Sequence, residues 1–576
     1  MESGLNNYPP AGDLRKLFDE RPVPVLSSEV VGKISFAEVS ESDQAATFVK
    51  AFLDALRENN AEALRDCFFA DQAYWKDALA FTYHLRTFLQ IAGGLEWKIW
   101  ILSTKLENLD IHPEDESLLY AQGRNMDNVQ KIETDVFIIG GGNAASALTA
   151  RLKALGVDSI MAERNARVGD NWALRYDCMK FHVPTSFCDM PYMGYPDKCR
   201  GTYCLSKDDL ADHLARYVDS FNLNIITSVK IQSTVYDKSK QEWTILLQVP
   251  TGAVTVTAKH LVQATGVSSQ KPYIPFVADK QMYTGVNIHS SGYKNGQTMV
   301  EQGVKSVLII DSANTAFDIL ADCHAAGLQV TMVVRSPTYI CPLEYICNDF
   351  SLGAYNFDVA RGDKMFLTLP SAVEGQLARN LFRVLASQEP DRYAALKAAG
   401  FPVLDSTEPN QALFSNLIEK AGGHYVDVGA TDLIAQGKVG VKAGVEPVAY
   451  TETGLRFSDG STEDSDAVIW CTGFADRDVR DVAAEILGGH AANEFRSDEN
   501  SLGPREIAAR LDSTWGIDSE GEIRGMWKRH LGLDNYWVMG GYTQQHRWHS
   551  RTLALQIKAS LEGILPPAYR ETLGTG

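Results

Sequence analysis

The chain has 576 residues, of which 45% are hydrophobic and 22% are charged, a composition typical of a globular protein with two to four domains. The formal net charge of −19 argues against binding to nucleic acid or to anionic membranes, since both favour basic surfaces. Scattered cysteines, no long apolar stretch and no signal-peptide core favour a cytoplasmic location.

The N-terminal region is predicted to precede the main fold. Residues 1–40 show no hydrophobic periodicity and are expected to form an arm. Residues 41–110 contain three short helical patterns followed by the alternating segment "EWKIWIL", which predicts a small α+β domain. Residues 111–133 are acidic and polar, and we interpret them as a linker.

The sequence changes at Asp135 to an alternation of strands and helices. The segment "DVFIIGGGNAASALTARLKALGVDSIMAER" predicts a strand, a glycine turn, a helix and a second strand that ends at Glu163. The alternation continues to residue 334 and predicts the α/β class with parallel sheets. Residues 336–425 hold few strand signals and are interpreted as an insertion that is helical in part.

The segment "GGGNAA" fits the dinucleotide-binding pattern G-x-G-x-x-G/A. Gly140 permits the tight turn, Gly142 lets backbone amides approach a pyrophosphate, and Ala145 keeps the helix close to the strand. Glu163 lies 23 residues after Gly140, where its carboxylate would accept hydrogen bonds from adenosine ribose hydroxyls and repel a 2′-phosphate. The loop therefore predicts FAD or NAD, and a glycine turn without a ligand is the alternative.

Several ordered motifs resemble those of the flavin-containing monooxygenase family. In "ERNARVGDNWALRYDCMKFHVP" the family pattern E-x5-G-x2-W-x2-R-Y is matched by Glu163, Gly169, Trp172, Arg175 and Tyr176. "YTGVNIHSSGY" matches the family fingerprint, with tyrosine in place of the first phenylalanine. "VQATGVSSQKPYIP" and "DAVIWCTGF" match the two stretches where the chain crosses between nucleotide domains.

The resemblance implies two Rossmann-like domains. The FAD-binding domain is expected to comprise residues 134–275 and 430–576, and the NADP-binding domain residues 276–429. The N-terminal region resembles the nuclear-transport-factor-2-like domain of an extended branch of the family. The residues implied to bind FAD are Gly140, Gly142, Asn143, Ala145, Glu163, Arg164, Gly169, Trp172, His182, Thr265, Gly266 and Gly473.

A second strand–loop–helix pattern, "VLIIDSANTAFDIL", lies where the family carries its nicotinamide-nucleotide loop. Its glycines are missing, and Asp311 places a carboxylate near the expected pyrophosphate. We expect NADPH binding to survive, weakened by charge repulsion. Arg335 suits a 2′-phosphate because guanidinium offers a bidentate fork, although a strand-end arginine in solvent is the alternative. The residues implied to bind NADP are Ser312, Asn314, Thr315, Arg335 and Ser336.

The implied activity is monooxygenation. In the family, NADPH reduces the flavin, dioxygen adds at flavin C4a, and the resulting (hydro)peroxyflavin oxygenates nitrogen or sulfur or inserts oxygen beside a carbonyl. His289 in the fingerprint is a tentative catalytic residue, with a structural histidine as the alternative. His546 and His549 lack a carboxylate at useful spacing, so no metal site is predicted.

The expected partners are a small or medium organic substrate and dioxygen, with a homodimer possible. Two other functions remain open. The chain could be a flavoprotein oxidase or reductase whose nicotinamide site has degenerated at Asp311. It could also be a non-catalytic scaffold stabilised by FAD, since fold alone does not establish function.

Overall fold

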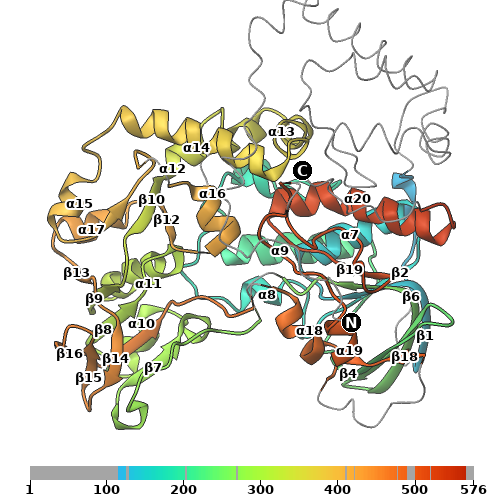
Figure 1. Cartoon of the computed structure of the whole chain (residues 1–576), viewed down its shortest axis with the longest axis horizontal. Helices are drawn as coiled ribbons and strands as arrows, with labels where there is room; N and C mark the ends of the chain where they lie inside the picture. Colours follow the sequence, from blue (N-terminus) through green and yellow to red (C-terminus); the bar gives the residue numbers. More distant parts are fainter. Residues whose placement is uncertain are drawn as a thin grey trace, which may run out of the picture.

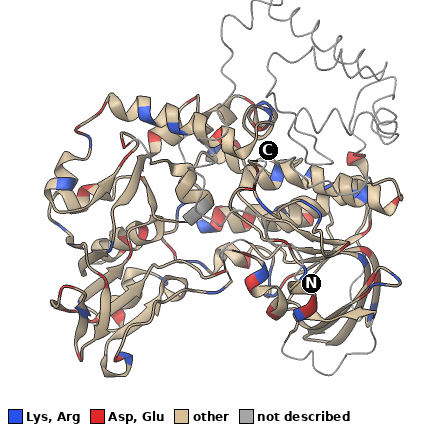
Figure 2. Cartoon of the chain, viewed as in Figure 1, with Lys and Arg blue, Asp and Glu red and all other residues tan. Residues whose placement is uncertain are grey.

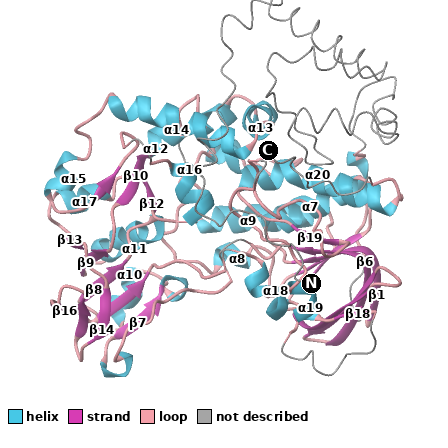
Figure 3. Ribbon diagram, viewed as in Figure 1, coloured by secondary structure: helices cyan, strands magenta, loops and turns pink. Residues whose placement is uncertain are grey.

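The structure is a computed structural model, and it describes residues 114–124, 129–200, 204–266, 270–408, 411–420, 422–476, 478–489, 500–518 and 521–565. The predicted arm and the predicted small α+β domain lie outside the described residues. Two α/β units lie side by side, each with its own sheet (Figure 1). The strands form two separate groups in Figure 3, with helices between and above them.

The first unit is built on an eight-stranded sheet with the order β18-β4-β5-β6-β1-β2-β3, in which β19 also pairs with β6. Its centre is parallel, and β4, β5 and β6 form an antiparallel meander at one side. The strands are β1 (Lys131–Ile139), β2 (Ser159–Ala162), β3 (Ile225–Ile226), β4 (Lys230–Asp237), β5 (Glu242–Val249), β6 (Gly252–Gln263), β18 (Ser501–Leu502) and β19 (Tyr536–Val538).

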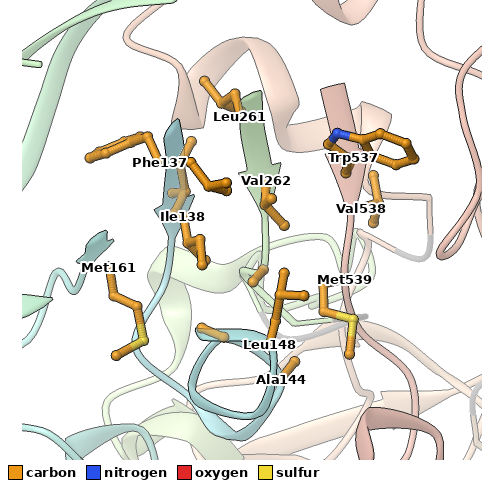
Figure 4. Packing of buried hydrophobic residues seen from close by; sticks show 14 of the residues in the cluster. Phe137, Ile138, Ala144, Leu148, Met161, Leu261, Val262, Trp537, Val538 and Met539 are labelled. Carbon is orange, nitrogen blue, oxygen red and sulfur yellow. The ribbon is translucent and has the colours of Figure 1, made fainter. Parts of the chain in front are cut away.

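The core of the first unit forms where helices cover this parallel centre. The apolar end of β1 is buried on both faces, as expected for a central parallel strand. Each fully buried large apolar side chain contributes about 1.5–3 kcal/mol to folding. Side chains from β1, β6 and β19 meet those of α7 (Asn143–Ala154) in Figure 4. Helices α9 (Lys207–Ser220) and α20 (Thr543–Leu561) complete this layer.

The second unit is built on a five-stranded sheet that is parallel throughout, with the order β13-β9-β8-β17-β7. An antiparallel sheet of β14, β15 and β16 lies beside it. The elements are β7 (Val286–His289), α10 (Gly296–Glu301), β8 (Ser306–Ile310), α11 (Asn314–Ala325), β9 (Gln329–Val334), β13 (Gly440–Ala443), β14 (Pro447–Tyr450), β15 (Gly454–Phe457), β16 (Thr462–Asp464) and β17 (Ala467–Trp470).

The predicted insertion at 336–425 is largely helical and also contains a small parallel sheet with the order β11-β10-β12. This sheet is formed by β10 (Thr338–Pro342), β11 (Val403–Leu404) and β12 (His424–Asp427). The longer helices are α13 (Val359–Leu367) and α14 (Ser371–Ser387). The α/β class with parallel Rossmann-like sheets is therefore confirmed for the described part of the chain.

Two predicted boundaries differ from the structure. The expected return to the FAD-binding domain at residue 430 is too early, because β17 inserts between β8 and β7 of the second sheet. The predicted linker at 111–133 is partly a docked segment. Its Glu114 side chain is buried and accepts hydrogen bonds from Arg151 at 2.6 Å and from Tyr192 at 2.7 Å. The polar composition of the segment did not predict this docking, because the Glu114 charge is paired with Arg151 inside the protein.

Charged residues of both signs are interspersed over the two units (Figure 2). Among the described residues, no helix combines the length and the apolar character needed to cross a bilayer.

Candidate functional site

Two loops of similar backbone conformation mark the nucleotide-binding candidates. After β1, Gly140 has φ +116° and Gly142 caps α7 with φ −82° and ψ −172°. After β8, Asp311 has φ +105° and Ala313 caps α11 with φ −90° and ψ −177°. Each loop thus directs the unpaired N–H groups of a helix start towards the carboxyl edge of a parallel sheet, where nucleotides bind.

The strand register gives the two loops equivalent neighbours. Gly140 N–H donates to the carbonyl of Ala162, and Asp311 N–H donates to that of Val333, at 2.8 and 3.1 Å. The residue after Ala162 is Glu163, whereas the residue after Val333 is the fully buried Val334. The second loop therefore lacks the strand-end carboxylate that lies beside the first.

The first loop fits a dinucleotide. A Cβ on Gly140 would fall well inside contact distance of the Ala264 carbonyl, so the turn approaches β6 too closely for a side chain. At Gly142 a Cβ would meet only the Asn171 amide, at 3.5 Å, so that face of the loop is open. The loop is tight towards the sheet and accessible towards the helix start, which suits a pyrophosphate. Ala145 is fully buried, as its predicted packing role requires.

Glu163 is held over the first loop. Its Oε2 accepts a hydrogen bond from Gly141 N–H at 2.9 Å, and its Oε1 accepts one from Asn165 N–H at 2.7 Å. The carboxylate is mostly buried, and these amides fix its position at the end of β2. An adenosine ribose at this edge would meet an oriented acceptor, and a 2′-phosphate would meet a negative charge.

Two further predicted FAD residues are in direct contact. The Trp172 indole N–H donates to the Asn143 Oδ1 at 2.7 Å, which joins α8 (Asp170–Ala173) to the first turn of α7. Gly169 caps α8 with φ +88°, and a Cβ there would lie 2.6 Å from the Ala211 carbonyl. This glycine is required for the close approach of α8 and α9.

The first crossover between the units is fixed in part by Asp476, which lies just beyond the second crossover motif. Arg164 donates to the Gln270 side-chain oxygen at 2.7 Å, and the Gln270 amide group donates to the Thr265 carbonyl. The backbone N–H groups of Gln270 and Lys271 both donate to Asp476, at 3.0 and 2.8 Å. Gly266 in this stretch has φ +83°. Asp476, from the second crossover, thus ties the two crossovers together.

His289 joins β7 to the second crossover. Its Nδ1 accepts from Ser291 N–H at 3.1 Å, so the proton is on Nε2, which donates to the Gly473 carbonyl at 2.9 Å. The same carbonyl accepts from Tyr273 N–H at 2.9 Å. Burial lowers the pKa of the imidazole below its ordinary value. Both ring nitrogens are engaged within the protein, which favours the structural alternative for this residue.

His182 was expected to bind FAD, and the structure places it against the second unit. Its Nε2 lies 3.2 Å from the Asp318 carboxylate on α11, and the Tyr176 hydroxyl donates to the other oxygen at 2.9 Å. His182 and Asp318 are both more than 90% buried at their side chains. The pairing spans 142 residues between Tyr176 and Asp318, so no local pattern predicts it.

Three of the predicted NADP residues contact other parts of the protein, and the other two are exposed. The Ser312 hydroxyl lies 2.5 Å from that of Thr338, and Asn314 Oδ1 accepts from Val426 N–H at 2.8 Å. These two side chains tie the loop to β10 and β12. Thr315 faces the Tyr176 hydroxyl at the contact between units.

Arg335 and Ser336 are exposed immediately after β9. The Arg335 side chain is 76% exposed, and its nearest carboxylate, Glu446, lies 4.0 Å away. The guanidinium is therefore available to an anionic ligand beside the second loop. Asp311 is inside this loop, and its Oδ1 accepts from Ser312 N–H at 2.8 Å. Burial raises the pKa of the Asp311 carboxyl to about 6.

A cleft of about 870 Å³ opens between the two units, away from the residues predicted to bind nucleotides. Its first-unit wall is loop 177–180 with Cys204 and Ser206. The opposite wall comes from the insertion, including Tyr393, and from loop 427–429, which follows the insertion. Sequence analysis missed this cleft because the walls from the two units are more than 130 residues apart in the chain.

Comparison with known proteins supports the two-loop arrangement. A profile of the pyridine nucleotide-disulphide oxidoreductase family matches residues 137–340. The chain is 27% identical to indole-3-pyruvate monooxygenase YUCCA1 of Oryza sativa subsp. japonica over 346 residues, which are 58% of this chain and 76% of that protein. It is 26% identical to probable indole-3-pyruvate monooxygenase YUCCA10 of Arabidopsis thaliana over 347 residues, 60% of this chain and 82% of that protein.

The fold matches a solved monooxygenase structure. Cyclohexanone monooxygenase from Rhodococcus sp. Phi1 bound to NADP+ superposes with a TM-score of 0.50 and 15% identity, over 75% of this chain and 85% of that chain. The chain is thus similar in sequence to indole-3-pyruvate monooxygenases and in fold to cyclohexanone monooxygenase.

Proposed function

We propose that this enzyme uses NADPH to reduce bound FAD and then transfers one oxygen atom from dioxygen to a small or medium organic substrate. The observation that carries the proposal is the pair of loops with the same backbone conformation, one at the carboxyl edge of each parallel sheet.

The charges beside the loops support one cofactor for each loop. FAD fits the first loop, because the oriented Glu163 carboxylate favours ribose hydroxyls and disfavours a 2′-phosphate. NADPH fits the second loop, because Val334 replaces that carboxylate and the exposed Arg335 follows it. On this assignment the first unit is the FAD-binding domain and the second the NADP-binding domain.

The chain's own residues bind and align the cofactors. When bound, FAD supplies the hydride acceptance and the dioxygen chemistry, which amino-acid side chains do not perform readily. The amides at the starts of α7 and α11 hold the two pyrophosphates. His289 and Asp476 hold the crossovers in place, and Asp318 holds α11 against Tyr176 and His182. Their roles are orientation, with the chemistry left to the cofactor.

A carbonyl compound is the favoured substrate class. The two sequence relatives are named for indole-3-pyruvate, a 2-oxo acid, and oxygen insertion beside a carbonyl would act on such compounds. Oxygenation of nitrogen or sulfur is the alternative reaction on the same scaffold. The cytoplasmic location and the possible homodimer stay predictions.

Anaerobic mixing tests the first half of the proposal. Full-length, FAD-loaded enzyme should lose its oxidised-flavin absorbance near about 450 nm rapidly with NADPH and more slowly with NADH. Admission of oxygen in the presence of a 2-oxo acid, a ketone and a thioether then tests the second half. Product from one carbonyl probe, with one NADPH consumed for each product, is the expected result. Unchanged flavin absorbance with both nucleotides would refute NADPH-driven oxygenation.

A flavoprotein oxidase or reductase is the second candidate, and Asp311 is the observation that favours it. A carboxylate in the nucleotide loop opposes an anionic ligand. An enzyme of this kind would keep its flavin and be reduced directly by its substrate, without NADPH. Anaerobic flavin reduction by the organic substrate alone would identify it.

A further inference from the structure

In each loop one backbone N–H donates to a carboxylate, but the two carboxylates come from different places. The first loop uses a residue at the end of the neighbouring strand, and the second loop uses a residue of its own. In the first loop Gly141 N–H donates to Glu163, from the end of β2. In the second loop the equivalent amide is that of Ser312, and the equivalent strand position is the apolar Val334. Ser312 N–H donates instead to Asp311 Oδ1, at 2.8 Å.

This arrangement requires an unfavourable backbone conformation. Asp311 has φ +105°, a region that side-chain-bearing residues rarely adopt, and glycine holds the same place in the first loop with φ +116°. Two hydrogen bonds hold the residue there: its N–H donates to Val333, and its carboxylate accepts from Ser312. A glycine would adopt this backbone conformation without strain. The backbone therefore does not require an aspartate here, and the effect of the carboxylate on the loop has to be considered separately.

The negative charge of the Asp311 carboxylate is only partly offset by its neighbours. The titratable groups that face it are the Arg335 guanidinium, following β9, and the Cys471 thiol, following β17. Desolvation outweighs the favourable effects of Arg335 and of Ser312 N–H, and it raises the pKa of Asp311 to about 6. The carboxyl group therefore changes charge within the range in which an enzyme of this kind is assayed.

We propose that the Asp311 carboxylate, when ionised, repels the NADPH pyrophosphate from the second loop, so that nicotinamide-nucleotide affinity falls as pH rises. The inference rests on the proposed function of the second loop. Binding of NADPH is therefore favoured when the Asp311 carboxyl group takes up a proton. Asp311 is thus an affinity-determining residue, and the loop is weakened without being lost.

Titration calorimetry with NADP+ tests this on full-length, FAD-loaded enzyme. Asp311→Asn keeps an acceptor for Ser312 N–H and a side chain tolerated at positive φ, and removes only the charge. At about pH 8 this variant should bind NADP+ roughly tenfold more tightly than the wild type, the effect of a shift of about one pKa unit on binding. At about pH 5.5 the two affinities should converge.

Two controls separate the effect from other titrations. The ligand's 2′-phosphate also titrates near about pH 6, but it does so equally in both proteins, so the difference between them reports Asp311. Asp459→Asn removes another second-unit carboxylate that accepts a backbone N–H, from Ser461 at 2.9 Å, and it should leave the wild-type profile unchanged. Asp311→Gly should bind at least as tightly as Asp311→Asn at high pH.

The outcomes are distinct. Equal NADP+ affinity for wild type and Asp311→Asn at about pH 8 would overturn the repulsion by Asp311 while leaving the nicotinamide site intact. No NADP+ binding by wild type, Asp311→Asn and Asp311→Gly at any pH would overturn the nicotinamide site itself, and this inference with it.

Discussion

The Tyr176 hydroxyl donates a hydrogen bond to the Asp318 carboxylate at 2.9 Å, and this bond joins the first unit to the helix that carries the second nucleotide loop. His182 contacts the same carboxylate at 3.2 Å. One side chain of α11 thus receives two contacts from a single loop of the first unit. The relative position of the two nucleotide loops depends on this contact.

We expect Tyr176→Phe to slow flavin reduction by NADPH about tenfold, because displacement of a bound reactant by an ångström is costly to a transfer reaction. FAD content should be unchanged, since Tyr176 lies away from the first loop. Tyr293→Phe is the matched control: its hydroxyl donates to Asp322 on the same helix at 2.5 Å, but within the second unit. Stopped-flow absorbance measures both. Equal slowing by the two variants would refute a role in positioning the units.

The glycines of the first loop should fail in different ways. Gly140→Ala should destabilise the first unit by about 2 kcal/mol or more, because the new Cβ meets the Ala264 carbonyl and φ is +116°. Gly142→Ala should keep the folding stability of the wild type but bind FAD more weakly, since its Cβ enters the space left for the pyrophosphate. Thermal unfolding and FAD titration of the apoproteins separate the two effects. Equal loss of stability in both variants would contradict this account.

Arg335 should determine the preference for NADPH over NADH. Arg335→Gln should lower kcat/KM for NADPH by roughly 10- to 100-fold, the range expected for loss of a hydrogen bond to a charged group, and leave NADH almost unaffected. Steady-state flavin reduction with both nucleotides provides the measurement. Arg456→Gln, at an exposed arginine on β15 of the same unit, serves as the control and should leave both nucleotides unaffected. A parallel fall for NADPH and NADH would show that Arg335 does not read the 2′-phosphate.

Local sequence patterns were sufficient for the first loop and for the fold class. The apolar run before Gly140 and the spacing to Glu163 act over about one βαβ unit, and the structure places both residues at one sheet edge. Patterns of this kind report contacts between neighbours in the chain. They succeed where β1, α7 and β2 follow one another in order.

The same patterns were insufficient where contacts span long separations. The β17 strand inserts between β7 and β8, although more than 150 residues separate it from either, so the domain boundary was misplaced. The docking of Glu114 on Arg151 depends on a buried ion pair, which a polar segment does not reveal. The contact of His182 with Asp318 likewise depends on how the two units pack.

The buried pair of Arg547 and Asp363 should stabilise the junction between α20 and the insertion. Arg547 donates to both Asp363 oxygens at 2.7 Å, and also to the Phe187 and Asp189 carbonyls. Asp363→Ala should cost about 3–5 kcal/mol, because it leaves a buried charge without its partner. Replacing Asp363 with Leu and Arg547 with Met together should recover part of the lost stability. Denaturant unfolding, monitored by the release of flavin, measures the stability of each variant. A double variant less stable than Asp363→Ala would contradict the argument.

Asp311 should make the stability of the second unit depend on pH. Its pKa is raised from 3.8 to about 6 by burial, so the folded protein holds a proton that the unfolded chain has released. Stability therefore falls as pH rises from about 4 to about 6, and above this window the ionised group costs up to about 3 kcal/mol. Asp311→Asn does not titrate, so its advantage over the wild type should be small at about pH 4 and reach its full size by about pH 7. Thermal midpoints of both proteins across this range, measured without nucleotide, report the difference. A constant difference at every pH would mean that the carboxyl group does not titrate in this window, and an advantage that shrinks as pH rises would reverse the sign of the argument.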